Sequence, residues 1–110
     1  MTDLSAFIRA RVTLLPPEAG GRRTAIASSY RCNCRLPDHA EGLFFDATFR
    51  MCDGDLLNPG ETAMAQIEPH HPDDWVSVEI GTVIEMCEGP RLIGRAVVTE
   101  LFGDPEWAPE

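Results

Sequence analysis

The sequence contains no lysine, so all nine of its positive side chains are arginine, against eighteen Asp and Glu. The resulting formal charge of −9 disfavours nucleic-acid binding, because affinity for a phosphate backbone depends on Lys and Arg contacts. No apolar run approaches membrane-spanning length, and the N-terminal MTDLSAFIRARV lacks the apolar stretch of a secretory signal. We therefore expect a cytoplasmic protein with no membrane partner, whose four cysteines are reduced thiols.

Motifs that hold nucleotides or indicate catalysis are also missing. Neither GxxxxGK[ST] nor GxGxxG occurs, so no nucleotide is expected as a cofactor, and GxSxG is absent as well. Structural zinc sites usually pair their cysteines as C-x₂₋₄-C, whereas one residue separates Cys32 from Cys34, and Cys52 and Cys87 are isolated. The sequence predicts no enzyme, metal or cofactor. A site assembled in space from Cys52, Cys87 and the histidines remains an alternative.

Alternation of apolar and polar residues with period two recurs along the chain, which is typical of half-buried strands. It is clearest in FIRARVTLL, whose apolar face consists of Ile8, Ala10, Val12 and Leu14. Further extended runs are expected at 25–36, 44–51, 62–68, 76–80, 82–86 and 91–102. No stretch has convincing helical spacing. Six or seven short strands in 110 residues predict one all-β domain, a barrel or a sandwich.

Three local features refine this expectation. Cys32 and Cys34 share the apolar face of their run, which predicts core thiols that act as small hydrophobic side chains. Gly94 interrupts the last run and indicates a bulge or a tightly packed site. The acidic, proline-rich residues 103–110 are expected to form a flexible tail.

Arginines supply the candidate binding chemistry. Gly20-Gly21-Arg22-Arg23 suits either an anion-binding nest or a plain hairpin loop. Arginine also suits stacking and bidentate contacts to phosphate or carboxylate, although pairing with the plentiful Asp and Glu explains most of the set equally well. The nine positions are Arg9, Arg11, Arg22, Arg23, Arg31, Arg35, Arg50, Arg91 and Arg95.

A series of short motifs covers nearly the whole chain, from about Phe7 to Leu101: ARVTLLPPEAGGRRT, SYRCN, FDAT, NPGE, IEPHHPDDW and EGPRLIGRAVV. Their order resembles the third, C-terminal β-barrel domain of elongation factor Tu. The resemblance implies a small antiparallel Greek-key β-barrel over residues 7–102, standing alone without the GTPase. In that family the barrel helps to bind the acceptor and T-stem of aminoacyl-tRNA, contacts the nucleotide-exchange factor and packs against the GTPase domain.

The resemblance also implies a set of contact residues, carried over by position. They are Arg23, Arg31, Asn33, Thr48, Glu88, Gly89 and Arg91. Two departures bear on tRNA: Cys32-Asn33-Cys34 replaces the family's Pro-Gln-aromatic, and Glu68 reverses a charge that is commonly basic in the family. We therefore expect a non-catalytic binding module that engages a translation-related protein, such as the exchange factor, the ribosome or a protein that recognises the elongation factor. The alternatives are an RNA-binding module that uses the arginine face and, as a third choice, a small enzyme or metal-binding protein.

Overall fold

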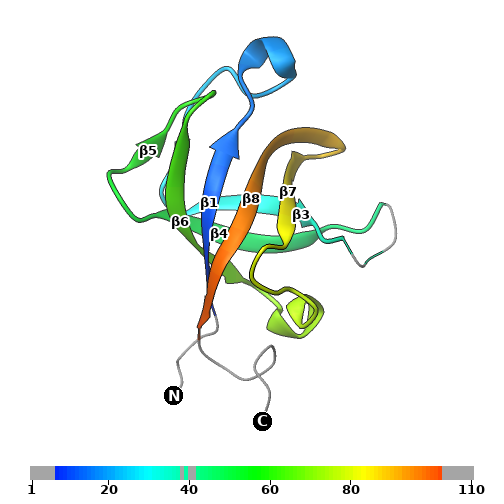
Figure 1. Ribbon diagram of the computed structural model, residues 1–110. Coiled ribbons are helices and arrows are strands. Elements are labelled where there is room, and N and C mark those ends of the chain that lie inside the picture. Colours follow the sequence, from blue (N-terminus) through cyan, green and yellow to red (C-terminus); the bar gives the residue numbers. More distant parts are fainter. Residues whose placement is uncertain (1–6, 38, 40–41, 103–110) are drawn as a thin grey trace.

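The computed structural model describes residues 7–37, 39 and 42–102, and they form an all-β domain (Figure 1). The elements in chain order are β1 (Phe7–Leu14), η1 (Pro17–Ala19), β2 (Ile26–Ala27), β3 (Tyr30–Arg35), β4 (Phe45–Met51), β5 (Leu56–Leu57), β6 (Thr62–Pro69), η2 (Pro72–Trp75), β7 (Val83–Glu88) and β8 (Arg91–Phe102). Both η elements are short 3₁₀ turns. In the described part of the chain, no helix is long and apolar enough to span a membrane. The expected flexible tail, 103–110, lies outside the described residues.

Six strands close into an antiparallel barrel in the order β1-β6-β4-β3-β7-β8, while β2 and β5 pair as a separate two-stranded sheet. This confirms the all-β prediction and decides for a barrel over a sandwich. In Figure 1, η1 lies at the top of the barrel and η2 at the bottom. The turn between β7 and β8 is at the upper end, and β7 begins at the lower end. The two ends of β7 therefore face two different ends of the barrel.

The core follows the alternation read from the sequence. The apolar face predicted for β1 is buried in full, with relative exposures of 0–1%. Cys32 and Cys34 of β3 are buried too, which confirms them as core residues. Trp75 and Phe49 are the largest fully buried side chains. Burial of one large apolar side chain contributes about 1.5–3 kcal/mol, so these inward faces supply the main favourable term for the fold.

The prediction of a strand at 76–80 is wrong. Val76 has right-handed helical angles and continues from η2, and the amide of Val78 donates to the carbonyl of Trp75 at 3.0 Å. Pro72 begins the 3₁₀ turn, and the complete burial of Trp75 holds that turn against the barrel. Packing of one large side chain has overridden a short alternating pattern, and Ile80 is left 67% exposed.

The run predicted at 25–36 is two strands, not one. Ser29 has a positive φ of 73°, which breaks the extended backbone between β2 and β3. Its amide donates to the carbonyl of Phe49 at 2.8 Å, which holds this bend against β4. β2 then leaves the barrel and pairs with β5, so Ile26 lies opposite Leu57.

Gly94 is both a bulge neighbour and a tightly packed site, as its position in the last run predicted. Met86 pairs with Gly94 and Cys87 pairs with Leu92, which leaves Ile93 as an extra residue in β8. A Cβ at Gly94 would lie 2.7 Å from the carbonyl oxygen of Thr13, so the paired strands β1 and β8 leave no room for a side chain at this position.

Candidate binding surface

The loop after η1 places Arg22 against the upper end of the barrel. Gly20 has a φ of +94°, and its amide donates to the carbonyl of Pro17 at 3.0 Å. Gly21 is more tightly constrained, because a Cβ there would lie 2.0 Å from the carbonyl oxygen of Leu15. These two glycines allow the chain to turn back, so that Arg22 reaches the end of β7.

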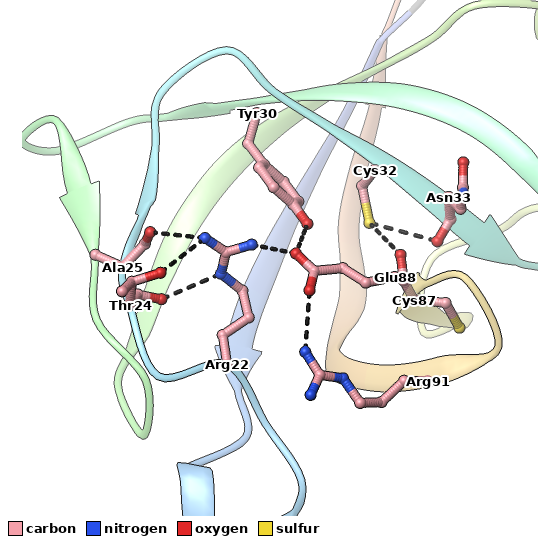
Figure 2. A network of polar contacts seen from close by, with 9 residues as sticks. All are labelled: Arg22, Thr24, Ala25, Tyr30, Cys32, Asn33, Cys87, Glu88 and Arg91. Atoms are coloured by element: carbon pink, nitrogen blue, oxygen red, sulfur yellow. Dashed lines mark hydrogen bonds and ion pairs between the residues drawn. The ribbon is translucent and has the colours of Figure 1, made fainter.

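Glu88 is the centre of a polar network at this end (Figure 2). The hydroxyl of Tyr30 donates to its Oε2 at 2.7 Å, and the guanidinium of Arg22 donates to the same oxygen. Arg91, on the other side of the turn, donates through Nη2 to Oε1 at 3.1 Å. Arg22 also donates to the carbonyl oxygens of Thr24 at 3.1 Å and Ala25 at 3.3 Å. Both oxygens of the carboxylate therefore already have donors.

The network changes the acidity of two of its members in opposite directions. Burial opposes ionisation of Glu88, but the hydrogen bonds from Tyr30 and Arg22 and the charge of Arg22 outweigh it, so the pKa of Glu88 falls below its ordinary value. Burial, and then the hydrogen bond to Glu88, raise the pKa of Tyr30 far above its ordinary value. At neutral pH the network therefore holds an ionised carboxylate and a neutral phenol.

Through these contacts Glu88 connects β3, the loop after η1 and β8, which stabilises this end of the barrel. The guanidinium carbon of Arg22 lies 5.4 Å from the centre of the Tyr30 ring, which adds a cation–π contact to the ion pair. Gly89 is exposed and has a φ of +59°, as the tight turn between β7 and β8 requires. Of the residues carried over from the elongation factor, Glu88 is thus engaged within the protein, while Gly89 and Arg91 are exposed beside it.

A second group of carried-over residues lies on the outer surface of β3 and β4, which we call the β3–β4 face. Arg31 is exposed and lies opposite Thr48, whose Oγ1 is 2.8 Å from Nε2 of His70. Asn33 lies opposite Asp46 on one side and Cys87 on the other. Because β3 lies between β4 and β7 in the barrel, this face continues toward the turn that follows Glu88.

The structure therefore brings most of the carried-over residues to adjacent strands, and Arg23 is exposed in the loop next to Arg22. Sequence reasoning missed Arg22 and Tyr30 as members of the Glu88 network. The Gly-Gly pair before Arg22 was a local signal of a special backbone. Nothing local indicated an ion pair between residues 66 positions apart in the chain.

Three thiols lie buried near this end, and Cys52 is exposed elsewhere. Sγ of Cys32 is 3.4 Å from the carbonyl oxygen of Asn33 and 4.0 Å from that of Cys87. A hydrogen bond with Cys32, together with burial, raises the pKa of Cys34, and burial raises the pKa of Cys87. The thiols of Cys34 and Cys87 are therefore protonated at neutral pH and poor nucleophiles. Within the described ranges, no three or more His, Cys, Asp or Glu residues form a group that could hold a metal ion.

No model of a known protein family matches the chain. The closed antiparallel barrel is a finding of the structure, whereas the resemblance to elongation factor Tu rests on the order of short sequence motifs. Membership of that family stays a prediction, and with it the roles of the carried-over residues.

Proposed function

We propose that the protein is a non-catalytic binding module of the elongation factor Tu C-terminal type, and that its β3–β4 face contacts a translation-related protein. The observation that supports the proposal most directly is that the guanidinium of Arg31 is exposed and unpaired among the described residues. This side chain is exposed on a barrel wall, and among the described residues it forms no ion pair and no side-chain hydrogen bond. A free guanidinium on a rigid strand is suited to bidentate recognition of a partner's carboxylate.

The surroundings of Arg31 favour a preformed surface. Thr48, directly across from it, is held by His70, and the neighbouring Arg50 is held by Glu68 at 2.8 Å. Side chains that are already ordered lose less conformational entropy when a partner binds. The ion pair also accounts for Glu68, whose charge is reversed relative to the family: in this chain it neutralises Arg50.

The test is direct binding of the full chain to a purified nucleotide-exchange factor of elongation factor Tu and, separately, to purified ribosomes. We expect binding to one of them, and Arg31→Ala should weaken it roughly tenfold, as truncation of an interfacial arginine commonly does. Arg11→Ala is the matched control, because Arg11 is also exposed on a barrel strand and should change affinity less than about twofold. If neither probe binds, or if both variants weaken binding equally, the proposal fails.

RNA binding is a second candidate function, favoured by one observation. Four exposed arginines form no ion pair among the described residues: Arg11, Arg23, Arg31 and Arg95. RNA binding through them would weaken steeply as salt is added, since each phosphate contact releases counterions. Titration with tRNA at several salt concentrations tests it. Tight binding that is insensitive to salt, or no binding at all, contradicts this candidate.

A small enzyme or metal protein is the third candidate, with Cys52, Cys87 and the histidines as its residues. The described part of the chain does not gather these residues: Cys87 is buried, Cys52 is exposed, and no group of three or more His, Cys, Asp or Glu there could hold a metal ion. Elemental analysis of untagged protein decides the metal version of this candidate. A zinc content close to one atom per chain would support it, and a content near zero would remove it.

A further inference from the structure

The lower end of the barrel contains a hollow that the Glu88 network and the β3–β4 face do not reach. It has a volume of about 340 Å³ and is lined by Pro37, Ser77, Glu79, Ile80, Gly81 and Thr82. This volume is within the range of pockets that accept a small ligand or a side chain. Five of its lining residues, at positions 77 to 82, belong to the segment that joins η2 to β7.

The segment that lines the hollow, together with its two flanking residues, exposes apolar side chains. Ile80 is 67% exposed, Val76 is 49% exposed and Val83, the first residue of β7, is 42% exposed. The registered pairs between β3 and β7 end at Arg35 opposite Glu85, so this part of β7 extends past its neighbour. Three large aliphatic residues are thus exposed within eight positions of the chain, whereas a single exposed one would be ordinary.

The same segment carries negative charge that the described part of the chain does not neutralise. Asp73, Asp74 and Glu79 are exposed and form no ion pair with any described residue. Elsewhere, the glutamates of β6, β7 and β8 are paired with arginines: Glu68, Glu85, Glu88 and Glu100. No arginine occurs in the sequence between Arg50 and Arg91. Three free acids therefore lie in the same segment as the exposed apolar residues, and the nearest arginines along the chain are far away.

We propose that this surface, the Ile80 surface (Asp73, Asp74 and residues 76–83 with the hollow), binds an extended segment of another protein in which apolar residues alternate with arginine or lysine. An apolar side chain of the partner enters the hollow against Ile80, and its positive neighbours meet Glu79 and the two aspartates. The charge excludes RNA and other phosphates as the occupant. A second copy of the chain is disfavoured by repulsion between two chains of charge −9.

This inference is independent of the β3–β4 face, because none of the residues of the Ile80 surface belongs to that face. The charge of the surface raises the association rate and the selectivity for a basic partner, and the hollow contributes affinity. Both are needed, so a probe that has only one of the two properties should bind poorly.

Fluorescence anisotropy with the full chain and three designed peptides tests the proposal. The first peptide alternates arginine with leucine, the second has glutamate in place of arginine, and the third has serine in place of leucine. We expect the first to bind with a Kd on the order of 10 µM and each of the others to bind at least roughly tenfold more weakly.

Variants then locate the site. Ile80→Ser should weaken binding of the first peptide about tenfold, and Glu79→Gln about threefold. The chain offers matched controls: Leu56 is 60% exposed and follows the exposed Asp55 on the separate two-stranded sheet. Leu56→Ser and Asp55→Asn should change the Kd less than about twofold, and unchanged unfolding midpoints would show that all four variants are folded.

Four results of the binding measurements overturn the proposal. They are no binding of the first peptide, equal binding of the glutamate peptide, equal binding of the serine peptide, and equal weakening by Ile80→Ser and Leu56→Ser. Sedimentation of the free chain tests whether a second copy of the chain occupies the surface. A dimer that Ile80→Ser dissociates would assign this surface to a second copy instead of a basic partner.

Discussion

The two ends of strand β7 differ in whether the charged side chains around them have partners within the protein. At its last residue, Glu88 is held by Tyr30 and two arginines, so each charge of this network has a partner within the protein. At its first residue, Val83 is exposed beside Ile80, and the acids next to it have no partner in the described part of the chain. Both ends lie in a strand that is buried in its middle, at Ile84 and Met86.

The difference lies in what the rest of the chain brings to each end. A loop that contains two glycines brings Arg22 to the Glu88 end, where its guanidinium pairs with the carboxylate. The Val83 end receives η2, the turn after it, and Pro37 and His39 of the segment after β3, and none of these described residues is an arginine. A saturated network stabilises the fold, whereas unpaired charge next to exposed apolar surface is available to a partner. The contrast between these ends is open to four tests of stability.

The glycines of the two ends should differ most. Gly21→Ala should destabilise the protein by about 3 kcal/mol, because its Cβ would overlap the carbonyl oxygen of Leu15. Gly81→Ala should cost about 1 kcal/mol, because Gly81 has a φ of +95° but open space around it. Urea unfolding measures both free energies. Equal losses would show that the loop before Arg22 is less constrained than the structure indicates.

Removing the charge of Glu88 should have the next largest effect. Glu88→Gln keeps the shape of the side chain but leaves two guanidiniums without a carboxylate, which should cost about 2 kcal/mol. Glu79→Gln at the other end is the control and should change the free energy of unfolding by less than about 0.5 kcal/mol. The same urea titrations measure it. If the control costs as much as Glu88→Gln, the two ends do not differ as described.

The Glu88 end should also make stability depend on pH. Because the pKa of Glu88 is lowered in the folded state, its contribution is present above the ordinary glutamate pKa and is lost as the pH falls through the lowered value. Because the pKa of Tyr30 is raised, its contribution is present below the ordinary tyrosine pKa of about 10 and is lost as the pH rises through the raised value.

Urea midpoints measured from about pH 3 to about pH 7 test the acid limb. Glu88→Gln should flatten that limb relative to the unaltered protein, and Tyr30→Phe should flatten the alkaline limb above about pH 10. An acid limb that is equally steep with and without Glu88 would assign the loss of stability to other carboxylates.

The smallest effect is expected at the exposed end. Ile80→Ser removes a side chain that is 67% exposed, so the thermal midpoint should change by less than about 2 °C. A large loss of stability would mean that Ile80 packs against the barrel, and it would argue against a surface kept for a partner. Circular dichroism during heating measures the midpoint.

Most strands could be predicted from alternation, because period two is a local property that survives whatever the strand later pairs with. The strand expected at 76–80 failed for a physical reason: the burial of Trp75 decided the conformation of the residues that follow it. The carried-over contact residues could be named from motifs. The contacts that these residues make within the protein could not be predicted, since Glu88 is paired with Arg22, which lies far from it in the chain.

The sequence by itself determined an all-β chain with buried thiols, a tight site at Gly94 and an acidic surface that contains arginine as its only positive residue. Tertiary structure alone decided the order of strands around the barrel, the partner of Glu88 and the separation of β2 and β5 from the main sheet. Alternation specifies which face of a strand is buried but carries no information on which strand lies beside it. Charge behaves in the same way: composition sets its amount, and the fold determines which charges are neutralised and which stay free.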